Sequence, residues 1–512
     1  MSGRSDGAPG SITQAYLDAC ERTPEKVWLS FEGQDHTYAG FLEVAARWAG
    51  ALSEWGLRPG DRVALFLENS PAFLAAFLGT HLAGGIAVLV NTQYRQVELR
   101  HILGDSGARV CVTDAAGERE LARVREDLPA LESVLVTEGA EATSVALALP
   151  VHPQAPRPDD VALIAYTSGT TGRSKGAMLT HANLAANSAS VTEAWRWTAS
   201  DRLLLTLPLF HVHGLGVGVN GTILRSASLE LHRRFDATVV YERVLSGDFS
   251  MFFGVPTMYT RLIAEAEKRA TDGERKSAPL RLYVSGSAPL SVQTFTDFQR
   301  LFGQRILERY GMSETLMNLT NPFDGERRPG TVGMPFPGQK ARVVDVRTRQ
   351  PLETEEPGEI QVRGPHVFKG YWDRPDATVE AFDSDGWFNT SDLGWRSVDG
   401  YFTISGRARE LIITGGYNVY PREVEEVLEA HAAVAEAAVM GLPDAEFGEQ
   451  IAAAVVLRER HAVTPEQLVE HCRDALASYK KPKQIFFVDA LPRNALGKVQ
   501  KHVLREQLNA AT

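Results

Sequence analysis

Short apolar runs alternate with amphipathic segments along most of the chain, and this alternation is the feature that most restricts its fold. The segment "FLEVAARWAGALSEWGL" at 41–57 has apolar residues at helical spacing, namely Phe41, Leu42, Ala45, Trp48, Ala49 and Leu52. The apolar runs "RVALFL", "IAVLV", "RVCVT" and "SVLV" that follow it are typical of buried strands. Helices interleaved with buried strands predict a layered α/β body in which most strands are parallel.

The length and a change of character near residue 400 predict two domains. A chain of 512 residues is too long for one compact core. After the polar, glycine-rich stretch at 398–421, the sequence predicts a helix starting at Pro421, strands at "AEAAVMGL", "IAAAVVL" and "QIFFV", and a helix near "EQLVEHCRDALASY". We therefore expect a large layered N-terminal domain over 1–405 and a small, mobile α+β C-terminal domain over 406–512, joined by a hinge near 407–410.

Composition excludes several classes of protein. The formal charge of −11 argues against a general nucleic-acid binder that neutralises phosphates. The three cysteines, Cys20, Cys111 and Cys472, are far apart and suggest neither a disulfide framework nor a zinc site. No run approaches the length of a membrane span, and the start lacks the apolar core of a secretion signal. We expect a cytoplasmic protein that acts on small molecules, either a monomer or a homodimer.

The stretch "YTSGTTGRSKGAMLTH" at 166–181 is rich in small hydroxylated residues and glycines. It follows a predicted strand, "DVALIAYT", and precedes a predicted helix, "HANLAANSAS". A glycine-rich loop can present successive backbone N–H groups to an anion, and Lys175 adds a full positive charge. The stretch therefore predicts a polyphosphate site. Its spacing is not that of the common nucleotide-triphosphate loop, because Gly172 is followed by Arg173, Ser174 and Lys175, and its composition alone also suits a surface loop.

This stretch and four others, "ERYGMSET", "NTSDLG", "GRARELIITGGYNVYPREVE" and "PRNALGK", resemble the motifs of the adenylate-forming superfamily. That superfamily comprises acyl-CoA synthetases, nonribosomal adenylation domains and firefly luciferase. The resemblance implies ATP, Mg²⁺ and coenzyme A as the reactants and cofactor. It also implies a reaction in two halves. A carboxylate attacks the α-phosphorus of ATP and releases pyrophosphate, and a thiol then attacks the acyl-adenylate and releases AMP.

The resemblance also implies roles for individual residues. The β- and γ-phosphates are assigned to Thr167, Ser168, Gly169, Thr170, Thr171, Gly172 and Lys175. Tyr310 is implied to stack on adenine, Glu314 to hold Mg²⁺, and Asp392 and Arg407 to bind the ribose hydroxyls. Lys498 is implied to reach the α-phosphate from the C-terminal domain, where its charge would stabilise the transition state. Neighbouring motif positions are expected to line the nucleotide site: Ser287, Ala288, Glu308, Arg309, Gly311, Met312 and Ser313.

For the second half of the reaction the resemblance implies rotation of the small domain about a hinge at Arg409. Members of the superfamily usually have Asp or Lys at that position, so the arginine is a departure. After rotation, residues of the "TGGYN" segment would line a tunnel for the pantetheine arm of coenzyme A, namely Gly415, Gly416 and Tyr417. His211 is implied to be a gate beside the carboxylate pocket, and His213 to be structural.

Within the superfamily the chain looks most similar to malonyl-CoA synthetases, through "GVPTMYTRLI", "LRLYVSGSAPL" and the segment around "ERYGMSET". The resemblance implies that Arg281 faces the second carboxylate of the acid and that Ser285 and Gly286 line the same pocket. A planar guanidinium suits a small dianion, although Arg281 could equally end a strand at the surface.

We expect malonate, or methylmalonate, as the substrate. Four alternatives remain open. They are a CoA ligase for another short- or medium-chain or aromatic acid, an enzyme that loads a carrier protein in trans, a luciferase-like oxygenase, and a non-catalytic nucleotide-binding module.

Overall fold

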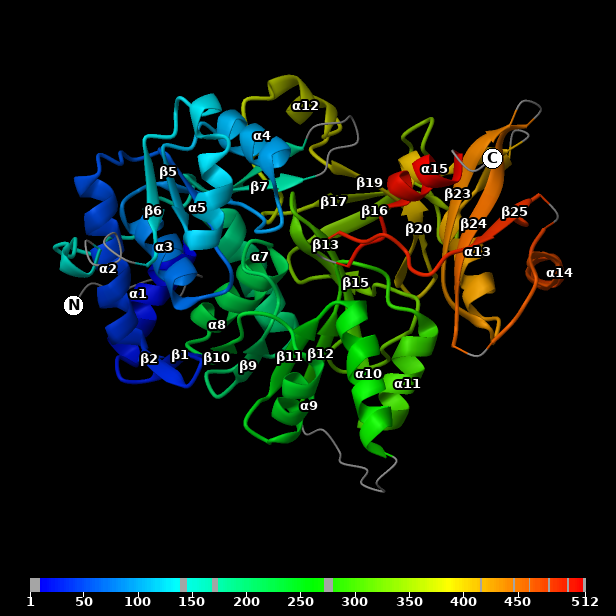
Figure 1. The fold of residues 1–512 in the computed structure, drawn as a ribbon, viewed down its shortest axis with the longest axis horizontal. Coiled ribbons are helices and arrows are strands. Elements are labelled where there is room, and N and C mark those ends of the chain that lie inside the picture. The colour runs from blue at the N-terminus through cyan, green and yellow to red at the C-terminus, as the bar shows by residue number, and fades with distance from the viewer. Residues whose placement is uncertain are drawn as a thin grey trace.

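The structure of the chain is a computed structural model that describes residues 10–138, 145–167, 174–270, 280–414, 417–444, 447–459, 461–477, 479–494 and 497–509. Figure 1 shows a large body, coloured blue to yellow, with a smaller unit in orange and red at one side. The body contains three β-sheets and the smaller unit contains one. A large N-terminal domain and a small C-terminal domain are therefore confirmed, while the division at 405/406 stays a prediction.

The first sheet has nine strands in the order β15-β14-β13-β12-β11-β9-β10-β1-β2. Strands β1 and β9 to β13 pair in parallel, and the edge strands β2, β14 and β15 are antiparallel. The bounds are β1 Val27–Phe31, β2 Gln34–Thr37, β9 Arg202–Leu205, β10 Ser228–Leu231, β11 Met251–Gly254, β12 Leu282–Ser285, β13 Ile306–Met312, β14 Leu316–Thr320 and β15 Met334–Pro335.

The second sheet has seven strands in the order β18-β8-β7-β4-β3-β5-β6. Its parallel part ends at β7, and β8 returns antiparallel to β7 as a hairpin. The bounds are β3 Arg62–Phe66, β4 Ile86–Leu89, β5 Val110–Thr113, β6 Ser133–Val136, β7 Val161–Thr167, β8 Lys175–Thr180 and β18 Gly370–Tyr371. Strand β8 was not predicted. A chain that reverses over a few residues can only pair as a hairpin, whereas a parallel partner needs a long crossover.

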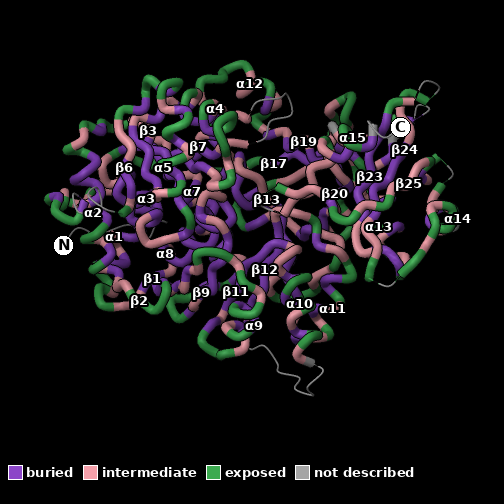
Figure 2. Tube along the Cα trace, viewed as in Figure 1, coloured by how far each residue is buried: buried purple, intermediate pink, exposed green. Residues whose placement is uncertain are grey.

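Helices fill the space between these two sheets and cover their outer faces, and large apolar side chains from both are packed into shared core clusters. Figure 2 shows buried residues concentrated in the interior of the body. Helices α1 to α3, α7 and α8 contribute to the core shared by both sheets, α9 to α11 cover the far face of the first sheet, and α4 and α5 cover the far face of the second. The bounds are α1 Ile12–Arg22, α2 Tyr38–Glu54, α3 Pro71–Leu82, α4 Gln96–Ser106, α5 Ala115–Ala122, η1 Arg125–Asp127, α7 His181–Ala194, π-helix η2 His213–Val219, α8 Asn220–Leu224, α9 Ala237–Leu245, α10 Pro256–Ala270, α11 Val292–Phe302 and α12 Pro375–Glu380.

A third, fully antiparallel sheet follows in the chain, with the order β16-β17-β19-β20. Its bounds are β16 Lys340–Val344, β17 Gly358–Arg363, β19 Phe388–Arg396 and β20 Phe402–Arg407. The prediction of mostly parallel strands is thus confirmed for the first two sheets and wrong for this one, in which all neighbouring strands pair antiparallel.

The C-terminal unit starts after the short helix η3, Ala408–Glu410, and folds around a five-stranded sheet. Helices α13 and α14 pack on one face and α15 on the other, as predicted for an α+β unit. The bounds are β21 Ile412–Thr414, β22 Tyr417–Val419, α13 Pro421–Glu429, β23 Val434–Asp444, β24 Gly448–Leu457, α14 Pro465–Ala475, β25 Gln484–Phe487 and α15 Lys501–Asn509.

The loop before α15 reaches across to the body. Gly497 has a φ of +75°, and a Cβ placed on it would lie 3.0 Å from Oγ1 of Thr257 at the start of α10. The residue next to the predicted catalytic lysine therefore packs against the N-terminal domain. Within the described part of the chain, none of the helices is both long and apolar enough to cross a membrane.

Candidate active site

The hairpin of β7 and β8 carries the two ends of the predicted phosphate loop. Thr167 and Lys175 face each other in its register. Thr167 Oγ1 donates a hydrogen bond to Glu314 Oε1 at 3.2 Å, and Lys175 Nζ lies 5.2 Å from the ring centroid of Tyr371. The intervening predicted ligands lie outside the described residues: Ser168, Gly169, Thr170, Thr171 and Gly172. The hairpin thus places one hydroxyl on the carboxylate of Glu314 and one cation over the ring of Tyr371.

Glu314 is the predicted magnesium ligand, and its carboxylate is almost completely buried. Its Oε1 also accepts a hydrogen bond from the Tyr371 hydroxyl at 3.1 Å. Burial raises the pKa of Glu314, so its ionised form needs a nearby cation. In the described ranges no group of three or more His, Cys, Asp or Glu side chains could hold a metal ion. One carboxylate of this kind fits Mg²⁺, which takes hard oxygen ligands and commonly shares them with phosphates.

Tyr310, Asp392 and Arg407, which were predicted to bind adenosine, lie together. The Tyr310 hydroxyl donates to Oδ2 of Asp392, and Arg407 Nε lies 2.5 Å from Asp392 Oδ1. Asp392 and Arg407 are direct partners across β19 and β20, so the third sheet delivers both to the end of β13. Met312, at the end of that strand, and Ser313 just after it are half-buried. The structure brings these groups together, while their roles toward ATP stay predictions.

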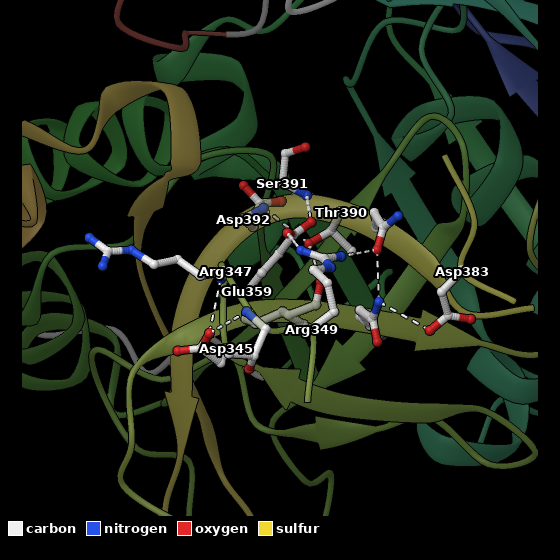
Figure 3. A network of polar contacts seen from close by, with 12 residues as sticks. Asp345, Arg347, Arg349, Glu359, Asp383, Thr390, Ser391 and Asp392 are labelled. Carbon is white, nitrogen blue, oxygen red and sulfur yellow. Dashed lines mark hydrogen bonds and ion pairs between the residues drawn. The ribbon is translucent and has the colours of Figure 1, made fainter. Parts of the chain in front are cut away.

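A network behind Asp392 determines how its strand is turned (Figure 3). Ser391 has a φ of +58°, a left-handed value that is unfavourable for a residue with a side chain. Its N–H donates to Oε1 of the buried Glu359 at 3.0 Å, and Glu359 is in turn paired with Arg349. Thr390 Oγ1 accepts the N–H of Asp392 at 3.0 Å. These bonds stabilise the strained backbone of β19 next to Asp392, whose carboxylate accepts the hydrogen bond from Tyr310.

Arg309 occupies the carboxyl end of the parallel part of the first sheet, where ligands of such sheets bind. Its side chain is buried, with 3% of the residue exposed. Burial lowers its pKa to about 9. Nε and Nη2 have no hydrogen-bond partner among the described residues. A Cβ on Gly286 would lie 2.5 Å from Arg309 Cζ, so only glycine leaves room for the guanidinium.

Two histidines lie beside this guanidinium and are held neutral. Burial, and then the charge of Arg309, lower the pKa of His211 to about 4. The same two causes lower the pKa of His213 further. The backbone N–H of His213 donates to Nδ1 of His211 at 3.2 Å, and Ser287 Oγ lies 3.3 Å from Nδ1 of His213. Neutral imidazoles next to one arginine leave that arginine as the only full positive charge among these three side chains.

Glu308 precedes Arg309 on β13 and faces the loop that follows β12. Its Oε1 accepts the N–H of Leu290 at 2.9 Å, which ties down the loop that contains Ser287 and Ala288. Burial raises the pKa of Glu308 to about 8, so the group is a poor counter-ion for Arg309 at neutral pH. Glu308 therefore contributes little negative charge beside Arg309 at neutral pH.

The prediction for Arg281 is wrong in this structure. Its Nε and Nη2 each lie 2.7 Å from the carboxylate oxygens of Asp201, and its Nη1 donates to the Trp195 carbonyl at 2.9 Å. It immediately precedes β12, at the opposite end of the strand from Ser285 and Gly286. A guanidinium whose donors are used by a buried carboxylate at the amino end of the sheet cannot also bind a substrate at the carboxyl end.

The C-terminal domain contributes the loop that contains Lys498. The backbone N–H of Lys498 donates to Asn494 Oδ1 at 3.0 Å, which closes a tight turn around Gly497. The predicted tunnel residues Gly415 and Gly416, and the side chains of Tyr417 and Arg409, lie outside the described residues. Their roles stay predictions.

Sequence reasoning missed three contributors, namely the pocket role of Arg309, the contact of Tyr371 with Glu314, and the support of Ser391 by Glu359. Only Arg309 left a signal in the sequence, because a charged pair inside the otherwise buried strand "ILERYGM" is unusual. Tyr371 and Glu359 lie far from their partners in sequence, and no spacing rule connects them.

Comparison with known proteins gives one consistent family. A family model described as AMP-binding enzyme matches residues 17–372, and one described as AMP-binding enzyme C-terminal domain matches residues 423–498. A malonate–CoA ligase of Arabidopsis thaliana is 34% identical over 548 residues, covering 98% of this chain and 89% of its own length. A sulfoacetate–CoA ligase of Cupriavidus necator is 36% identical over 487 residues, covering 93% and 94%. The crystal structure of ATP-bound MatB from Rhodopseudomonas palustris superimposes with a TM-score of 0.92 at 39% identity, covering 98% of this chain and 99% of that one.

Proposed function

Since the chain belongs to the family of AMP-binding enzymes and is an AMP-forming acyl-CoA ligase that uses ATP, Mg²⁺ and coenzyme A, we propose that its acid substrate is malonate. The reaction forms a malonyl-adenylate from one carboxylate and then transfers the malonyl group to the thiol of coenzyme A. Methylmalonate is a close second substrate, because one methyl group is worth only about 1 to 3 kcal/mol of discrimination.

The observation that carries this proposal is the state of Arg309. Its guanidinium is buried, two of its donor nitrogens have no partner among the described residues, and the neighbouring histidines are neutral. A buried cation of this kind is costly when empty and favours a ligand that brings a negative charge and accepts two hydrogen bonds. Once one carboxylate of an acid is used in the chemistry, a second carboxylate supplies that charge.

The position of Arg309 also suits the second carboxylate of the acid. It lies on the same strand as Tyr310, whose hydroxyl contacts the proposed ribose ligand Asp392. The arginine pocket and the proposed nucleotide site are therefore both placed at the carboxyl end of β13. A short diacid can place one carboxylate at the arginine and the other beside the nucleotide.

The remaining residues take the roles that the family motifs imply. Thr167, Lys175 and the loop between them hold the triphosphate, Glu314 holds Mg²⁺, and Asp392 with Arg407 holds the ribose. Lys498 places its charge at the α-phosphate, where negative charge gathers in the transition state. The packing of Gly497 against Thr257 supports this arrangement for the first half of the reaction. The second half requires rotation of the C-terminal domain about Arg409, which brings Gly415, Gly416 and Tyr417 to the site.

Sulfoacetate is a competing acid that a specific observation favours. It also carries two negative groups on a short chain, and a relative of 36% identity is named for it. A guanidinium can bind a sulfonate or a carboxylate, so Arg309 alone does not separate the two acids.

The test incubates the purified protein with ATP, Mg²⁺ and coenzyme A and follows AMP and thioester with a panel of acids. The panel contains malonate, methylmalonate, sulfoacetate, malonamate, acetate, octanoate and benzoate. We expect malonate to give the highest kcat/KM. Preference for octanoate, benzoate or acetate over malonate would refute the proposal. Three other outcomes would indicate a different function. AMP formation that needs a carrier protein would indicate a carrier-loading enzyme, oxygen consumption a luciferase-like oxygenase, and ATP binding without turnover a non-catalytic nucleotide-binding module.

A further inference from the structure

Helix α4 contacts both ends of the hairpin that carries the predicted phosphate loop. His101 and Asp105 are four residues apart on this helix and so share one face. His101 Nε2 lies 2.8 Å from the carbonyl oxygen of Ser174, the residue that immediately precedes β8. Because a carbonyl can only accept, the imidazole Nε2 is the donor. The residue just before the returning strand is thus held by a side chain outside the sheet.

The other end of the hairpin is held by the next turn of the same helix. Tyr166 OH donates to Asp105 Oδ2 at 2.8 Å, and Tyr166 directly precedes Thr167. The second oxygen of Asp105 is paired with Arg374, which follows β18. The rings of His101 and Tyr166 meet edge to face with centroids 6.0 Å apart.

Helix α4 is itself a rigid support. Its other face buries Leu99, Ile102 and Leu103 in the core cluster that also contains Ile164 of β7. Arg100, the residue before His101, pairs with Asp127 on the surface. A rigid helix that hydrogen-bonds both flanks of a loop reduces the number of conformations that the loop can adopt.

We propose that His101 and Asp105 are positioning residues that set the separation of the two hairpin ends for the β- and γ-phosphates of ATP. The inference rests on the proposed function of the hairpin. It concerns only the flanks Tyr166 and Ser174, since neither His101 nor Asp105 touches the nucleotide. Loss of either residue should weaken the binding of ATP but not of AMP, because AMP lacks the two phosphates that this hairpin would bind.

The experiment measures the dissociation constants of ATP and AMP by calorimetry on the full chain with Mg²⁺ present. For His101→Ala we expect ATP to bind about fivefold more weakly, the value of one lost hydrogen bond, and AMP to bind within about twofold of the unchanged protein. His101→Gln keeps a donor at a similar reach and should recover most of the ATP affinity. Arg100→Ala is the matched control, because it removes a neighbouring surface ion pair of the same helix, and it should change neither constant.

Equal weakening of ATP and AMP in His101→Ala, or no change in either, would overturn the inference. If His101→Ala fails to fold, Tyr166→Phe tests the other flank with the loss of one hydroxyl, and the same selective loss of ATP is expected. The readout uses nucleotides alone, so it is separate from the identity of the acid. If the unchanged protein ligates no malonate, while His101→Ala still weakens the binding of ATP more than that of AMP, malonate is refuted as the substrate and this inference stands.

Discussion

Replacement of Arg309 by methionine is the most direct test of the substrate pocket. Methionine is similar in length, is apolar and brings no donor, so it removes the charge while largely filling the space. Nε and Nη2 have no partner among the described residues, and each would make a charge-assisted hydrogen bond to a second carboxylate. Such bonds are worth about 1.5 to 3 kcal/mol each. Their joint loss, about 3 to 6 kcal/mol, corresponds to a fall of roughly 10²- to 10⁴-fold in kcat/KM for malonate.

The same variant should be more stable than the unchanged protein in the absence of substrate. The pKa of Arg309 falls from the ordinary 12.5 to about 9, and a difference of one pKa corresponds to about 1.4 kcal/mol. The charged form is therefore disfavoured in the folded state by at most about 5 kcal/mol. This penalty is present at all pH values below the folded pKa and is relieved only as the pH rises above about 9, so Arg309→Met should raise the Tm at neutral pH.

The assay compares malonate with malonamate, in which a neutral amide replaces the second carboxylate at almost the same shape. Arg309→Met should reduce the ratio of the two kcat/KM values by a factor of at least about 10², while KM for ATP stays within about twofold. Arg281→Met is the matched control. It breaks the pair with Asp201 and should lower the Tm, yet leave the ratio unchanged. If the ratio of kcat/KM for malonate to that for malonamate stayed unchanged in Arg309→Met, or fell strongly in Arg281→Met, the role of Arg309 toward the second carboxylate would be refuted.

Four further changes test other parts of the site. Gly286→Ala places a Cβ 2.5 Å from Arg309 Cζ, so it should displace the guanidinium and lower kcat/KM for malonate by at least about tenfold, with KM for ATP unchanged in steady-state kinetics. Glu308→Gln should change the pH dependence of stability. Burial raises the pKa of Glu308 to about 8, so the folded protein keeps a proton that the unfolded chain loses near 4.5, and stability falls as the pH rises between these values. The variant should show a smaller fall in Tm between about pH 5 and about pH 9. Glu359→Ala removes the acceptor that holds the backbone beside the ribose carboxylate, and should weaken ATP and AMP alike, by about tenfold in calorimetry. Lys498→Ala should slow adenylation by about 10²-fold or more in pyrophosphate release, while a supplied malonyl-adenylate is still converted to thioester.

Each of these has an outcome that would count against it. Normal malonate kinetics in Gly286→Ala would mean that the guanidinium lies elsewhere when substrate binds. An unchanged slope of Tm against pH in Glu308→Gln would show that other groups dominate the titration. If Glu359→Ala weakened the binding of ATP but not of AMP, the network would not act through the ribose. If Lys498→Ala slowed adenylation and thioester formation equally, Lys498 would not be specific to the first half of the reaction.

The alternation of apolar runs and helical segments was enough to predict the layered body, because buried parallel strands and their covering helices leave a local pattern in the chain. The C-terminal unit was predicted for the same reason, and its helix from Pro421 and strands at 434–444 and 448–457 are present. The motifs also pointed to residues that the fold then brings together, such as Tyr310, Asp392 and Arg407. Strand β8 and the antiparallel third sheet were missed, since the direction in which two strands pair leaves no local pattern in the sequence.

The different environments of Arg281 and Arg309 come from the tertiary structure alone. Both residues belong to strand segments of the same sheet, and both have the chemistry to bind a carboxylate. The direction of the strands places one at the amino end, where Asp201 neutralises it across 80 positions of sequence, and the other at the carboxyl end with donors unused among the described residues. A sequence determines which side chains are available and which local elements they join. Which charge is satisfied and which is left for a ligand depends on partners that only the folded chain brings within reach.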